Sequence, residues 1–326
     1  MTATPGDLRL DTKSTPAPDP AAEPAGYVVV VEPNDRIHFL DWGGPDQGVE
    51  APSEAPGVLL VHGLSGTAWS WAPVARRLRR VRRTVALDLR GHGLSDAPTD
   101  GYDADTLAED VIAVGDGTGL VARPVVLAGH GFGAIVAAWT AARLGPSCAG
   151  LVLVDGGWED LRRSSGLEPD EFMRGLDEPP EILRSMTAYL RDREAFDPAT
   201  WDADQERAAR AAVVELPAGR VVPSSRPHAI AGSVAAMFDY RPLHVLSSVT
   251  APIVALMAAE DETDGRAAEL EGVRRALASA DGPGMAVAHF PSDGHNLPRY
   301  RPAEVTAAIL AVAAPHRRST ARRRHG

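Results

Sequence analysis

The amino-acid sequence predicts an α/β fold built on an eight-stranded, mostly parallel sheet with helices on both faces. Short apolar runs rich in Val and Leu alternate along the chain with segments of helical periodicity, which is the pattern of parallel strands joined by crossover helices. Hydrophobic residues make up 44% of the 326 residues and charged residues 24%. The chain therefore has enough apolar surface to bury such a sheet in one domain.

The predicted strands are short apolar runs, and the first two form an expected antiparallel pair. They cover residues 27–32, 37–42, 57–61, 84–89, 124–128, 151–154, 252–257 and 285–290. Helical periodicity fits five further segments, each between two of these strands or after the last. These helices are expected over residues 69–78, 105–114, 132–144, 266–278 and 302–313.

The alternation of strands and helices stops between residues 156 and 249. This segment is polar, helix-prone and interrupted by prolines, and it is too long for a loop in a compact domain. We expect an inserted helical lid over the carboxyl ends of the strands, where open α/β sheets bind ligands. The core then comprises residues 27–155 and 250–314, with a disordered tail over 1–26 and a basic tail over 315–326.

The net charge and the cysteine content limit which partners and cofactors the chain is expected to bind. The formal net charge of −11 argues against nucleic-acid binding, which needs a basic face, and favours a small apolar molecule as partner. The single cysteine, Cys148, excludes an internal disulfide and leaves no zinc-type spacing, so we expect neither metal nor cofactor. We find no secretory signal and no membrane span and expect a cytoplasmic protein. The oligomeric state is not predicted.

Two glycine-bearing turns follow predicted strands. Strand 57–61 runs into His62-Gly63-Leu64-Ser65-Gly66, and strand 84–89 runs into a loop, 90–96, of sequence RGHGLSD. With these motifs the chain resembles the α/β-hydrolase superfamily, particularly the branch of lidded epoxide hydrolases, cofactor-free haloperoxidases and C–C bond hydrolases. The resemblance covers about residues 27–314 and implies the α/β-hydrolase fold.

A third motif, Gly129-His130-Gly131-Phe132-Gly133, lies between strand 124–128 and an Ala-rich helix. This is the position of the nucleophile elbow, whose middle residue is normally a serine presented on a strained turn. Gly131 has no hydroxyl, but it suits the backbone conformation and relieves about 1–2 kcal/mol of strain. The fold is therefore expected to survive, whereas serine-type hydrolysis is excluded.

The resemblance also implies an acid after the seventh strand and a histidine after the eighth. His295, in the sequence Asp293-Gly294-His295-Asn296, is the predicted base. Asp261 is the predicted acid, with Glu260, Glu262 and Asp264 as close competitors. Asp155, at the end of the sixth strand, is a less favoured acid. The order of elbow, acid and histidine agrees with the family.

Other residues of these turns complete the candidate site. The backbone amides of Leu64 and Phe132 are expected to form an oxyanion hole. His62, Gly63, Ser65 and His130 are the candidate binding residues, although for both histidines hydrogen bonding to loop backbone is the competing interpretation. The hydroxyls of Ser65 and Ser95 lie off the elbow and are weak candidates for a substitute nucleophile.

Two functions follow from these expectations. In the first, His295 oriented by Asp261 acts as a general base on water or on a substrate proton, and the oxyanion hole stabilises the resulting anion. This describes a lyase, an isomerase or a water-mediated hydrolase. In the second, the chain is a catalytically inactive pseudo-hydrolase that binds a small ligand or a protein partner. The sequence leaves both open.

Overall fold

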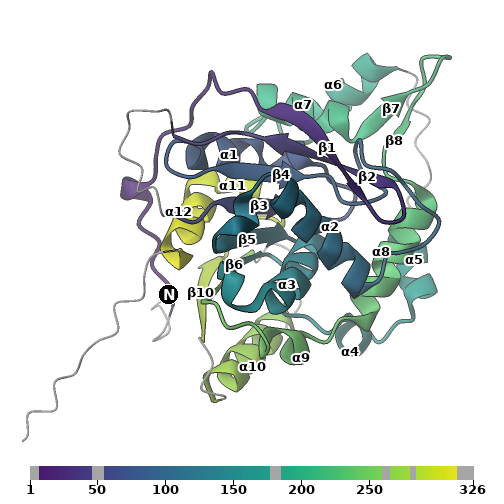
Figure 1. Ribbon diagram of the computed structural model, residues 1–326. Helices are drawn as coiled ribbons and strands as arrows, with labels where there is room; N and C mark the ends of the chain where they lie inside the picture. The colour runs from purple at the N-terminus through teal and green to yellow at the C-terminus, as the bar shows by residue number, and fades with distance from the viewer. Residues whose placement is uncertain (1–6, 46–54, 177–184, 259–264, 280–283, 314–326) are drawn as a thin grey trace, which may run out of the picture.

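The computed structural model describes residues 7–45, 55–176, 185–258, 265–279 and 284–313. Its main sheet has eight strands in the order β1-β2-β4-β3-β5-β6-β9-β10, and β1 and β2 form its antiparallel end (Figure 1). All eight predicted strands are confirmed. They are β1 (Ala25–Val31), β2 (Asp35–Asp41), β3 (Val58–Val61), β4 (Thr84–Leu87), β5 (Val125–His130), β6 (Cys148–Val154), β9 (Ile253–Ala258) and β10 (Met285–Phe290).

Helices cover both faces of the sheet because β3, β4, β5, β6, β9 and β10 carry apolar side chains on both sides. One apolar cluster contains side chains of α2 (Ala104–Gly117), α3 (Phe132–Leu144) and α10 (Arg266–Ser279). The other contains side chains of α1 (Ala72–Leu78) and α12 (Pro302–Val312). These five helices are the predicted ones, and the α/β-hydrolase architecture is confirmed.

The insertion between β6 and β9 is mostly helical where the structure describes it. Its helices are α4 (Leu161–Ser165), α5 (Pro169–Leu176), α6 (Met186–Phe196), α7 (Ala203–Ala211), α8 (Pro227–Asp239) and α9 (Pro242–Leu246). A small hairpin of β7 (Val213–Glu215) and β8 (Val221–Pro223) was not predicted, because strands of three residues are too short to show an alternating pattern. That the insertion acts as a lid stays a prediction.

The N-terminal segment corrects the expected disordered tail. From residue 7 onward it is docked on the core: the Leu8 amide donates a hydrogen bond to the Val287 carbonyl at 2.7 Å. Further along, the buried Arg76 guanidinium of α1 donates to successive carbonyls of this segment, those of Asp19, Pro20 and Ala22. This docking could not be predicted from the local sequence, because the hydrogen-bond donor, Arg76, lies in α1 and not in the N-terminal segment. Residues 1–6 and the predicted basic tail lie outside the described residues.

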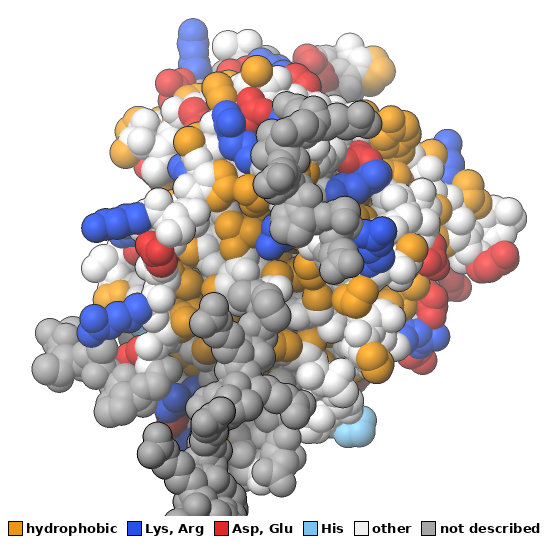
Figure 2. All heavy atoms as spheres, turned by 60° about the vertical axis from the view of Figure 1, so that its left-hand side comes forward, with side chains coloured by type: hydrophobic (Ala, Val, Ile, Leu, Met, Phe, Trp, Pro, Cys, Tyr) orange, Lys and Arg blue, Asp and Glu red, His pale blue; other side chains and the backbone are white. Residues whose placement is uncertain are grey.

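Apolar side chains are spread over the surface between charged ones. On the face that Figure 2 shows, orange apolar patches alternate with arginine and carboxylate side chains. The largest exposed apolar side chains lie far apart in the chain, with Val30 in β1, Leu94 after β4 and Phe196 at the end of α6. No helix in the described part of the chain is long and apolar enough to cross a membrane.

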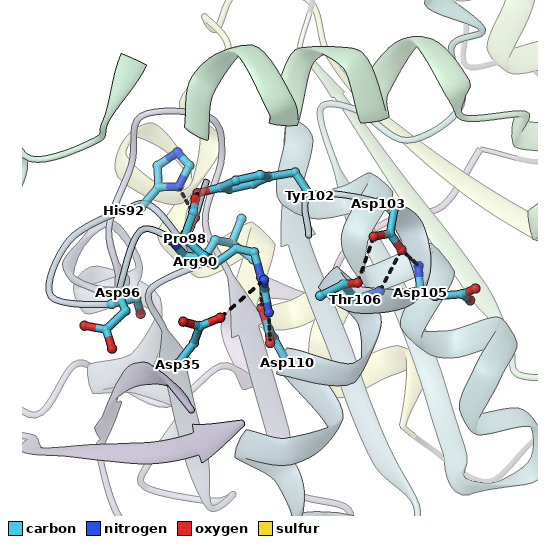
Figure 3. Close-up of polar contacts among 12 residues, drawn as sticks. Asp35, Arg90, His92, Asp96, Pro98, Tyr102, Asp103, Asp105, Thr106 and Asp110 are labelled. Atoms are coloured by element: carbon cyan, nitrogen blue, oxygen red, sulfur yellow. Dashed lines mark hydrogen bonds and ion pairs between the residues drawn. The ribbon is translucent and has the colours of Figure 1, made fainter. Parts of the chain in front are cut away.

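The loop after β4 is anchored by a buried ion pair. The Arg90 guanidinium binds the Asp110 carboxylate of α2 through two hydrogen bonds, of 2.6 Å and 2.7 Å, and Asp35 lies 3.9 Å away (Figure 3). Arg90 and Asp110 are 2% and 1% exposed, so each buried charge is stabilised by the opposite charge of its partner. The neighbouring Asp88 carboxylate accepts hydrogen bonds from the backbone amides of Ala68 and Leu94. Asp110 thus ties the loop after β4 to α2, and Asp88 ties it to the segment after β3.

Candidate active site

The turn between β5 and α3 has the geometry of a strand-turn-helix elbow. Gly131 has φ 54° and ψ −117°, a conformation that other residues rarely adopt. A Cβ atom on Gly129 would collide with the Gly133 backbone, and one on Gly133 would collide with the carbonyl of His62. The flanking glycines are therefore required by close packing of strand, turn and helix.

His295 faces the open side of this turn. A Cβ atom built on Gly131 would lie 3.1 Å from Nε2 of His295 and 3.3 Å from its Cε1. The opposite ring nitrogen, Nδ1, lies 2.6 Å from Oδ2 of Asp155. Because an ionised carboxylate only accepts, Nδ1 carries the proton and the lone pair of Nε2 points toward the elbow. The His295 side chain is half exposed, so a molecule from solvent can reach it.

The carboxylate that contacts His295 in the described part of the chain is Asp155, the acid that the sequence favoured less than Asp261. Asp155 directly follows β6, has φ 46°, and is 1% exposed. Burial alone would raise its pKa, but the hydrogen bond from His295 and the charge of Arg266 hold the pKa below its usual value. Asp261 and its competitors Glu260, Glu262 and Asp264 lie outside the described residues.

His130 supports His295 rather than facing a ligand. Nε2 of His130 lies 2.9 Å from the backbone carbonyl of His295, and the ring centroids are 4.4 Å apart. Burial, followed by the proximity of His295, lowers the pKa of His130 to about 3. His130 is therefore neutral at neutral pH and donates its Nε2 proton to that carbonyl. Hydrogen bonding to loop backbone is the interpretation that the geometry favours.

The turn after β3 lies against the elbow. The Cα of Gly63 lies 3.9 Å from the Cβ position on Gly131. His62 is fully buried, with Nδ1 2.7 Å from the Gly63 carbonyl and Nε2 accepting from the Leu89 amide at 3.0 Å. Both ring nitrogens contact backbone, so the geometry favours the competing interpretation of His62 as a residue that supports the loops. Ser65 is exposed, with φ 61°.

The two amides expected to form an oxyanion hole belong to the turn after β3 and to the elbow after β5. Phe132 is the first residue of α3, so its amide has no acceptor within the helix and lies at the positive end of the helix dipole. Leu64 follows Gly63, whose Cα borders the Gly131 position. Joint action of both amides on one oxygen stays a prediction.

Behind Asp155 lies a cleft of about 1000 Å³ between α4, α9 and α10. Its walls include the apolar side chains of Leu161, Leu243 and Val273 and the charged side chains of Arg163 and Arg266. No group of three or more His, Cys, Asp or Glu side chains suited to a metal ion occurs within the described ranges. The sequence ranked Asp155 below Asp261 as the acid and gave no indication of Arg266. The signal for Asp155 was a carboxylate at the end of a strand that neighbours the elbow strand.

Curated relatives match part of this chain. Over 108 residues the chain is 44% identical to protein phosphatase methylesterase 1 of Mus musculus, covering 32% of this chain and 28% of that relative. Over 121 residues it is 36% identical to N-formylmaleamate deformylase of Pseudomonas putida, covering 37% and 41%. The chain thus matches less than half the length of these curated relatives.

Solved structures match over most of the chain. E-2-(acetamidomethylene)succinate hydrolase superposes with a TM-score of 0.70 at 20% identity, covering 89% of this chain and 99% of that one. The thioesterase domain from the curacin biosynthetic pathway superposes with a TM-score of 0.68 at 21% identity, with the same coverage of 89% and 99%. The model of the alpha/beta hydrolase family matches residues 58–309. This chain belongs to the alpha/beta hydrolase family.

Proposed function

We propose that this protein is an enzyme in which His295, oriented by Asp155, acts as a general base, and in which Gly131 occupies the nucleophile position without supplying a nucleophile. One observation carries the proposal: Nε2 of His295 lies 3.1 Å from the Cβ position on Gly131 while Nδ1 is bonded to Asp155. The base is thus aimed at a place where a water molecule or a substrate proton can take the position of the absent serine hydroxyl.

The proposed reaction needs no covalent intermediate. His295 removes a proton from water as the water oxygen attacks a substrate carbonyl, and the amides of Leu64 and Phe132 stabilise the negative oxygen of the tetrahedral intermediate. The intermediate then collapses, the C–O or C–N bond of the ester or amide breaks, and protonated His295 returns its proton to the departing alcohol or amine, which leaves the carboxylic acid as the second product. A general base contributes roughly 10²- to 10⁴-fold, whereas loss of the nucleophile in a serine hydrolase costs on the order of 10⁶-fold in kcat. We therefore expect turnover well below that of a serine esterase.

Among the reaction types left open by the sequence, the relatives favour water-mediated hydrolysis over lyase or isomerase chemistry. Their names describe a methylesterase, a deformylase and a hydrolase. We propose a small, largely apolar ester or amide as substrate, held beneath the insertion of residues 156–249. The chemistry common to these names is cleavage of an acyl bond by water.

The second candidate is a pseudo-hydrolase that binds a small ligand or a protein partner without turnover. The absence of a side chain at Gly131 favours it, because the covalent route is closed. The preserved contact between His295 and Asp155 argues against it, because a binding protein has no need of a base held at 2.6 Å by a buried carboxylate.

Turnover by the wild type and by His295→Ala separates the two candidates. On a panel of short-chain p-nitrophenyl esters and anilides, the enzyme should lose about 10²- to 10⁴-fold of its turnover on His295→Ala while ligand affinity stays the same. His289→Ala, at an exposed histidine of β10, is the matched control and should keep full activity. Unchanged turnover in His295→Ala would refute the general-base role, and saturable binding without any turnover would favour the pseudo-hydrolase.

A further inference from the structure

We propose that Arg266 is a positioning residue that locks the Asp155 carboxylate and sets the proton affinity of His295. The inference deepens the proposed function, on which the kinetic part of its test rests. It is based on the contact between Asp155 and Arg266, whose side chain lines the cleft between α4, α9 and α10.

The two oxygens of Asp155 have different partners. Oδ2 contacts Nδ1 of His295 at 2.6 Å. Oδ1 accepts from the Ala258 amide at 2.9 Å and from Nη2 of Arg266 at 3.2 Å. Since the side chain is 1% exposed, a carboxylate held from both sides cannot rotate toward solvent. Arg266 and the Ala258 amide therefore fix the oxygen that does not touch the base.

Arg266 is itself held on the other side. Its Nε and Nη2 lie 2.9 Å and 2.8 Å from Oε1 of Glu159, and its guanidinium carbon lies 5.6 Å from the centroid of the Trp158 ring. Arg266 is the first residue of α10, whereas Asp155, Trp158 and Glu159 all follow β6. The guanidinium thus ties the loop carrying the acid to a different element of the core.

The charge of Arg266 has a predictable effect on the base. A carboxylate stabilises the imidazolium form of its histidine, and a guanidinium bound to the same carboxylate weakens that effect. Among the described residues, the other titratable groups near the pair are Glu159, which is paired with Arg266, and His130, which is neutral at neutral pH. Arg266 therefore favours the neutral imidazole, which is the form a general base requires.

NMR titration of the His295 imidazole tests this directly and does not depend on turnover. The resonance is assigned by its loss in His295→Ala. In Arg266→Gln the measured pKa of His295 should rise by about one unit, because a positive charge within reach of the pair is removed. Arg266→Lys, which keeps the charge, should restore most of the wild-type value.

Arg163→Gln is the matched control. Arg163 lines the same cleft and its loss changes the net charge equally, but among the described contacts it has none with Asp155. The control should leave the His295 titration unchanged. An equal shift in Arg163→Gln and Arg266→Gln, or none in either, would overturn the proposal.

A second variant keeps the test valid if Arg266→Gln does not fold. In Glu159→Gln the guanidinium loses its other described carboxylate partner, and a negative charge near Asp155 is removed, so the pKa of His295 should fall. No change there would also refute the proposal. The pH dependence of kcat/KM should move with the NMR value in each variant. A shift by NMR without turnover would leave the positioning role intact and refute the proposed function instead.

Discussion

At the scale of single residues, the site depends on which carboxylate holds His295. His295, Gly131 and the two amides were predicted from motifs, because each lies within a short pattern of glycines, and the structure places His295 beside Gly131. Asp155 was only a less favoured candidate acid, because a single aspartate at a strand end has no such pattern. Nothing in the sequence ranks Asp155 above Asp261; the contact of 2.6 Å between Asp155 and His295 does.

The two acids make different predictions. Asp155→Asn should lower turnover by about 10²- to 10⁴-fold, because the amide can no longer hold Nδ1 protonated and Nε2 free. Asp261→Asn is the matched control and should retain activity within a few-fold. Steady-state kinetics of both variants measure this. A larger loss of turnover in Asp261→Asn than in Asp155→Asn would show that the acid follows β9, the seventh strand of the main sheet in chain order.

At the scale of elements, regular strands and helices were predictable and irregular packing was not. The eight strands and five core helices have continuous apolar patterns of the right length. The β7–β8 hairpin is too short to show one. The docked N-terminal segment depends on hydrogen bonds from Arg76, which a local pattern cannot reveal.

The ion pair between Arg90 and Asp110 should dominate the stability of the loop after β4. Asp110→Asn leaves the Arg90 charge buried without its carboxylate, so the free energy of unfolding should fall by about 3–5 kcal/mol. Asp105→Asn removes an exposed carboxylate of α2, the helix that also carries Asp110. Asp105 is paired with Arg143 of α3, and its loss should lower the free energy of unfolding by less than about 1 kcal/mol. Urea denaturation measures both, and equal costs would show that burial does not set the strength of this pair.

At the scale of the whole molecule, parallel strand order assembles the site. Strands β3, β5, β6, β9 and β10 are parallel to one another, so their carboxyl ends meet at one edge of the sheet. Leu64, Gly131, Asp155 and His295 follow four of these strands. The predicted parallel sheet already indicated that the site lies at this edge. It could not predict which side chains touch there, because that depends on turn conformations such as the positive φ of Asp155.

Folding stability should decrease on acidification below neutral pH. Burial, then the proximity of His62, lowers the pKa of His92 to about 4, from an ordinary value of 6.5. Below about pH 6.5 the unfolded chain therefore binds protons that the folded chain excludes, and the free energy of unfolding falls as pH falls toward 4. His130, with a pKa lowered to about 3, acts in the same direction.

Urea denaturation between about pH 7.5 and pH 5 measures this dependence. His92→Asn removes the titrating ring while its amide can still donate to the Arg90 carbonyl, the contact made by Nδ1 of His92. The variant should show a shallower loss of stability than the wild type, whereas His289→Asn, at an exposed position, should follow the wild type. A wild-type slope retained in His92→Asn would contradict the assignment.

The central claim is that the elbow, the base and the backbone amides are assembled around Gly131 and that only a hydroxyl is missing. Gly131→Ser tests it most directly, with Gly131→Ala as the control that adds a Cβ alone. His295 must shift slightly because the new Cβ lies 3.1 Å from Nε2, and its half-exposed side chain has room to do so.

Mass spectrometry after treatment with a fluorophosphonate probe, together with hydrolysis of short p-nitrophenyl esters, provides the measurement. Gly131→Ser should be labelled at the new serine and should gain esterase activity over the wild type, while Gly131→Ala should not be labelled. A folded Gly131→Ser protein that neither labels nor hydrolyses, or a wild type that is itself labelled, would contradict it.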